Sequence, residues 1–74
     1  MAMYTPVRLN LRKDTVERVG WLQERLNSQT RTDAVVTAIE IAQIVVRALA
    51  DGGRVIIEEK GQEPFQVRIP SLQQ

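Results

Sequence analysis

The stretch from residue 31 to residue 50 is apolar around most of a helical circumference. After its first turn the polar residues form one narrow strip: Thr37, Glu40, Gln43 and Arg47. The remaining surface is made by Val35, Ile39, Ile41, Ala42, Ile44, Val45, Val46 and Leu49. A helix that is apolar nearly all round needs either a membrane or a second chain to cover it. The charges on the polar strip and the short apolar runs argue against a membrane, so the pattern predicts self-association.

Covalent and metal-based sources of stability are missing from this chain. It has 74 residues and no cysteine, so it has no disulfide. A single core of this size rarely supplies more than about 3–5 kcal/mol. Histidine is absent as well, which removes the common zinc and haem ligands and the imidazole and thiol catalysts. We therefore expect no metal and no cofactor, and we expect association to supply the missing stability.

Residues 6–12 predict a β-strand, because apolar and polar residues alternate from residue 7 onward with the period of a strand. Val7, Leu9 and Leu11 share one face, and Arg8, Asn10 and Arg12 share the other. A single strand is not stable by itself in water. Two copies are therefore expected to pair antiparallel in a twofold dimer, with the apolar face over the second helices of both chains.

A first helix is predicted over 15–27. Asp14 and Glu17 are three residues apart, a spacing typical of a capped helix start. One apolar stripe follows at helical spacing: Val16, Val19, Leu22 and Leu26. Asn27 tolerates the left-handed conformation, so it predicts the end of this helix.

A second helix is predicted over 31–50. Thr30 is expected to be its N-cap, with Asp33 at the third helical position. The sequence Asp-Gly-Gly at 51–53 predicts its end, because a glycine there can adopt the left-handed cap conformation.

Residues 54–70 predict a β-hairpin that follows the helices. Its strands are expected at 55–57 and 65–69, on either side of a polar turn. Prolines on both sides of the second strand are typical of an edge strand, because proline has no N–H to donate. Residues 71–74 are expected to be a loose tail.

The order of these elements, together with Arg-Leu-Asn-Leu-Arg at 8–12, resembles the ribbon-helix-helix family of Arc- and MetJ-like DNA-binding proteins. The resemblance covers residues 5–51, roughly two thirds of the chain, and it leaves out the hairpin. It implies an α+β fold in which an intertwined homodimer forms an intermolecular two-stranded antiparallel ribbon. To this fold the chain adds its C-terminal hairpin.

The resemblance implies a transcriptional repressor that binds double-stranded DNA, with dimers often arranged in tandem. A two-stranded ribbon fits the major groove, where arginine pairs with guanine and asparagine with adenine through two hydrogen bonds each. The expected base contacts are Arg8, Asn10 and Arg12. The expected phosphate contacts are Lys13, Thr30, Arg31 and Thr32, because the start of the second helix offers free N–H groups to an anion.

Other functions remain open on the sequence alone, since the net charge is only +1. One alternative is a protein-interaction module, such as an antitoxin or an accessory factor of plasmid partition or of a relaxosome, whose hairpin binds a protein partner. Another is a dimeric structural domain with no nucleic-acid role. An enzyme is not expected, because Glu58 and Glu59 are adjacent near a strand and would project to opposite faces. With no apparent signal peptide or membrane segment, a cytoplasmic location is expected.

Overall fold

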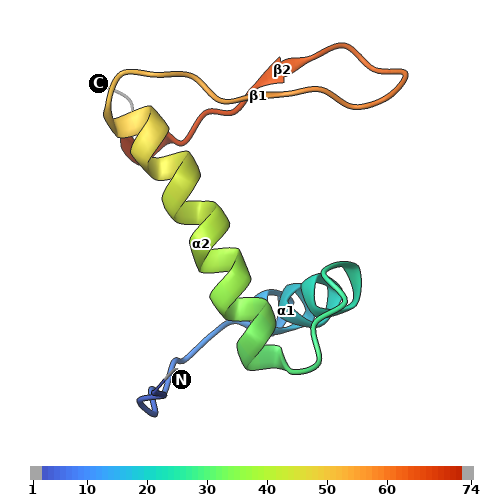
Figure 1. Ribbon diagram of the computed structural model, residues 1–74, viewed down its shortest axis with the longest axis vertical. Coiled ribbons are helices and arrows are strands. Elements are labelled where there is room, and N and C mark those ends of the chain that lie inside the picture. The colour runs from blue at the N-terminus through green and yellow to red at the C-terminus, as the bar shows by residue number, and fades with distance from the viewer. Residues whose placement is uncertain (1–2, 73–74) are drawn as a thin grey trace. The chain divides into compact units, whose positions relative to one another are not determined.

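The computed structural model describes residues 3–72, which form two helices followed by a small antiparallel sheet (Figure 1). The elements are α1 (Lys13–Arg25), α2 (Arg31–Ala50), β1 (Ile56–Ile57), β2 (Phe65–Gln66) and a short 3₁₀ helix, η1 (Pro70–Leu72). This content is that of a small α+β protein. The described residues form two compact units, 3–35 and 36–72, which divide within α2.

The predicted strand at 6–12 has no partner among residues 3–72, and residues 3–12 form no helix or strand. All of these residues are exposed. The predicted ribbon pairs this segment with a second copy, so the ladder cannot form within one chain, and the ribbon stays a prediction.

Helix α1 begins and ends two residues earlier than predicted. Its N-cap is Arg12, which makes no side-chain capping bond. The predicted cap at Asp14 is therefore wrong: this residue lies inside the first turn, where its carboxylate accepts from the N–H of Thr15 at 3.0 Å. The end of the helix follows the predicted mechanism, because Asn27 has a φ of 54° and its N–H donates to the carbonyl of Glu24 at 3.2 Å.

Helix α2 has the bounds that the sequence predicts. Thr30 caps its start, since its Oγ1 accepts from the N–H of Asp33 at 3.1 Å. At its end Gly52 has a φ of 81°, and the N–H of Gly53 donates to the carbonyl of Ala48 at 2.8 Å. This is the Schellman arrangement, in which a left-handed glycine closes the last turn.

The capping bond of Thr30 leads to a stability prediction. Thr30→Ala should lower the free energy of unfolding by about 1 kcal/mol, because it leaves a helix N–H without its side-chain acceptor. Urea unfolding measures the change. Thr32→Ala is the matched control, because the Thr32 hydroxyl makes no side-chain hydrogen bond with residues 3–72. An equal loss in both variants would contradict the capping role.

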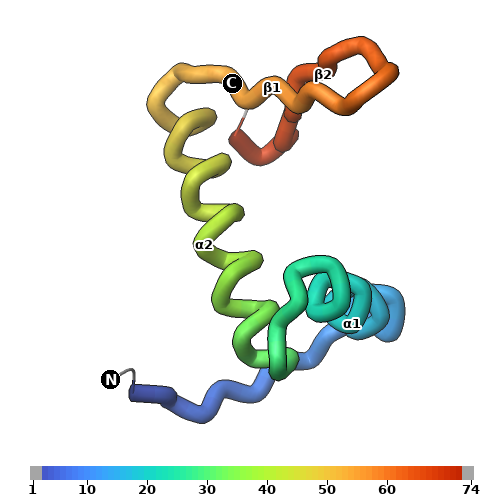
Figure 2. The backbone as a smooth tube through the Cα atoms, turned by 45° about the vertical axis from the view of Figure 1, so that its right-hand side comes forward, coloured from blue at the N-terminus to red at the C-terminus, as the bar shows by residue number. Residues whose placement is uncertain are grey.

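Strands β1 and β2 form the predicted hairpin, and Figure 2 shows its two arms side by side. Ile57 is opposite Phe65 and Ile56 is opposite Gln66. At the turn, the N–H of Gln62 donates to the carbonyl of Glu59 at 3.1 Å. The paired strands are shorter than the predicted 55–57 and 65–69. The beginning of the predicted 71–74 tail belongs to η1, and residues 73–74 lie outside the described residues.

The described residues contain almost no core. Ala34 alone is buried. The large apolar residues of α2 are exposed, with Ile44 at 67% and Ile39 at 61%. Val7 in the N-terminal segment is 75% exposed. Burial of apolar surface is the main favourable term in folding, so the single chain lacks the contacts that would stabilise these helices.

Candidate nucleic-acid interface

The three predicted base contacts lie on the extended segment that precedes α1. Arg8, Asn10 and Arg12 are all exposed. Arg8 and Asn10 make no side-chain hydrogen bond or ion pair with other residues of 3–72. Their polar groups are therefore available to a ligand.

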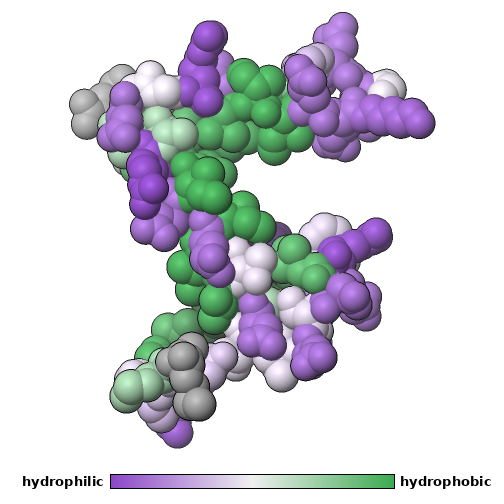
Figure 3. Space-filling model, viewed as in Figure 1, coloured by the Kyte–Doolittle hydropathy of each residue, from purple (hydrophilic) through white to green (hydrophobic). Residues whose placement is uncertain are grey.

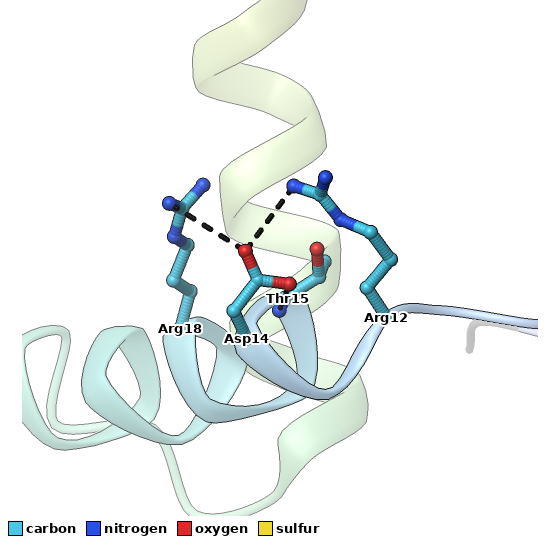
Figure 4. A network of polar contacts seen from close by, with 4 residues as sticks. All are labelled: Arg12, Asp14, Thr15 and Arg18. Atoms are coloured by element: carbon cyan, nitrogen blue, oxygen red, sulfur yellow. Dashed lines mark hydrogen bonds and ion pairs between the residues drawn. The ribbon is translucent and has the colours of Figure 1, made fainter.

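Arg12 differs from the other two because it is paired with Asp14. Its Nη2 lies 3.2 Å from Asp14 Oδ2, and Nη2 of Arg18 lies 3.9 Å from the same oxygen (Figure 4). The side chains of Arg12 and Arg18 are 78% and 73% exposed. Exposed ion pairs contribute about 0–1 kcal/mol, so Arg12 can exchange this carboxylate for another acceptor at little cost.

The predicted phosphate contacts lie at the starts of the two helices. Lys13 is the first residue of α1, and Arg31 and Thr32 are the first two residues of α2. All three are exposed. The N–H groups of Arg31 and Thr32 have no acceptor within their own helix, and they carry the positive end of its dipole. The start of α2 is therefore suited to an anion.

One hollow brings the N-terminal segment and the start of α2 together. Tyr4 lines it with Thr30, Thr32 and Asp33. Sequence reasoning did not identify Tyr4, and no pattern around it indicated this hollow, because the hollow joins residues far apart in the chain. The structure thus places two predicted phosphate contacts, Thr30 and Thr32, around the same hollow as Tyr4.

Asp33 is the one acidic residue in this hollow. Its backbone N–H serves the Thr30 cap, and its carboxylate adds a negative charge near the start of α2. That charge is favourable to the helix dipole and unfavourable to a phosphate, so the anion would be held from the side of Arg31 and Thr32.

The described part of the chain shows no metal-binding group and no membrane-spanning helix. Residues 3–72 contain no group of three or more acidic side chains placed to hold a metal ion. Neither helix in that range is long and apolar enough to cross a membrane.

No family model, curated protein or solved structure matches this chain.

Proposed function

We propose that the chain is a homodimeric ribbon-helix-helix protein that binds DNA sequence-specifically and represses transcription. The observation that carries the proposal is the exposed segment 7–12, which alternates apolar and polar side chains and has no strand partner in the described part of its own chain. Pairing with a second copy satisfies its backbone and places Arg8, Asn10 and Arg12 of both copies on one ribbon face. Such a ribbon can enter the major groove and read base edges.

The start of α2 supports the same proposal. Its free N–H groups and the exposed cations Lys13 and Arg31 suit contacts with phosphates, which set the position of a protein on DNA. The near absence of a core in the single chain supports the dimer, because a second copy would cover the apolar residues of α2 and of segment 7–12.

A mobility-shift titration against random and selected duplex pools tests this function. We expect enrichment of a short repeated or palindromic site, with half-sites about one helical turn apart. Raising the salt concentration from 50 to 200 mM should weaken binding about 100-fold, because each dimer has four Lys and Arg contacts with phosphates. Failure to retain any duplex at low salt would overturn the proposal.

The hairpin favours a second candidate function if DNA binding fails. Ile57 and Phe65 are exposed on it, which is consistent with a protein-interaction module, such as an antitoxin or a plasmid accessory factor. Limited proteolysis of the free protein separates the two. Rapid cleavage between Arg54 and Arg68 would favour a partner-binding tail, and resistance would favour an integral hairpin.

Asp14 provides a test of the electrostatics of the interface. Asp14→Asn removes the carboxylate that pairs with Arg12 and Arg18, and should tighten binding to random duplex about fivefold per dimer. Filter binding at low salt measures this change. Glu17→Gln is the matched control, because it makes the same charge change in α1 at a residue without an ion pair among residues 3–72. Equal effects would show that net charge alone matters and that the pairing with Arg12 does not.

A further inference from the structure

The two strands of the hairpin place their apolar residues mainly on one face. Ile57 is directly opposite Phe65, and the N–H of Val67 donates to the carbonyl of Val55 at 2.8 Å. Directly opposed residues of an antiparallel pair project to the same side, and strand alternation adds the two valines to that side. We call Val55, Ile57, Phe65 and Val67 the hairpin apolar face.

The hairpin apolar face is incompletely covered in the single chain. Val55 and Val67 are half-buried, whereas Ile57 is 39% and Phe65 is 49% exposed. The opposite side carries Gln66 with Ile56. The face is thus a sheet surface that lacks an apolar partner, and its exposure increases toward the turn.

Both ends of the hairpin lie near the end of α2. On the way in, Gly53 donates to the carbonyl of Ala48, and a Cβ at Gly53 would lie 2.8 Å from that carbonyl oxygen. On the way out, Ser71 and Leu72 of η1 line a hollow together with Leu49 of α2. The residues that enter and leave the hairpin thus both lie near the end of α2.

The hairpin apolar face and the part of α2 from Val36 onward belong to one unit, 36–72. Figure 3 shows hydrophobic side chains along α2 and along the hairpin. Val46, near the end of α2, is exposed as well, so this unit has apolar surface on both its helix and its hairpin.

We propose that the hairpin apolar face packs against the second copy of the chain and extends the dimer interface formed by α2. This inference rests on the dimer of the proposed function and assigns the hairpin to it. A second copy is the occupant that the surface fits, because the adjoining α2 needs a second chain in any case. By twofold symmetry each copy both supplies a hairpin and receives one.

Isotope-filtered NMR on a mixed dimer of labelled and unlabelled wild-type chains tests the proposal directly. Phe65 is the only phenylalanine of the chain, so its ring signals are unambiguous. We expect nuclear Overhauser effects from the Phe65 ring to isoleucine or valine methyl groups of the other copy. A dimer in which this ring shows only contacts within its own chain would overturn the proposal, and so would a monomer.

A pair of variants of the full chain provides the second test. Phe65→Ser should weaken self-association at least tenfold in sedimentation equilibrium, because the serine removes a ring from the interface. Gln66→Ser, one residue along on the opposite side, should leave it unchanged. Equal association of both variants and wild type would overturn the proposal. If the variants behaved as expected but the wild type did not bind DNA, only the DNA-binding function would be overturned.

Discussion

Arg8→Ala and Asn10→Ala should each weaken binding to the selected duplex at least about 30-fold. Each side chain can make one bidentate contact with a base, worth about 1–3 kcal/mol of discrimination, and a dimer carries each side chain twice. Both residues are exposed, and neither makes a side-chain hydrogen bond within residues 3–72. Removing them should leave the protein folded. Mobility shifts against the selected and a scrambled duplex measure the effect.

Two controls separate base reading from general attraction to DNA. Lys13→Ala should weaken binding to both duplexes by a similar factor, because phosphate contacts carry no sequence information. Arg68→Ala, on the exposed hairpin, should change neither by more than about twofold. If Arg8→Ala and Asn10→Ala kept full affinity as dimers, the assigned reading face would be wrong.

The second large effect is expected for a substitution in α2 that weakens the dimer. Ile44→Ala should raise the dissociation constant of the dimer about a thousandfold. Truncating a buried isoleucine costs about 2–5 kcal/mol, and a dimer loses two. Ile44 is 67% exposed in the single chain, so this cost arises only if a second copy covers it. Sedimentation equilibrium measures the constant, and circular dichroism at several protein concentrations follows the linked loss of helix.

Gln43→Ala is the matched control, since it truncates the neighbouring residue on the polar strip of the same helix. It should leave association within about threefold of wild type. A thermal midpoint of the wild type that did not depend on protein concentration would contradict the dimer, and an unchanged dimer with Ile44→Ala would exclude this residue from the interface.

Helix signals that are satisfied within a few residues were predictable from the sequence. Thr30 needs only the N–H three residues later, and Asn27 needs only the left-handed conformation that it adopts. The Asp14 cap was mispredicted because α1 begins at Lys13, with Arg12 as its N-cap, so that Asp14 lies inside the first turn. A spacing rule for capping does not fix which residue begins the helix.

Features that depend on residues far apart in the chain were harder to predict from the sequence. The predicted strands were too long only at the ends away from the turn, where residue 55 and residues 67–69 lie outside the observed strands. The hollow that Tyr4 lines together with Thr30 and Thr32 joins segments that no local pattern relates. The ribbon at 6–12 would need a second chain, so one chain cannot test it.

The near absence of a core in the single chain has a consequence for how such a protein would respond to its own abundance. If pairing supplies the core, folding is a second-order event, and the amount of folded dimer rises with the square of the chain concentration when chains are scarce. Unpaired chains, with Ala34 as the one buried residue among those described, would be substrates for proteolysis. The occupancy of a DNA site would then rise from low to high over a narrower range of synthesis rates than it would for a protein that folds as a monomer.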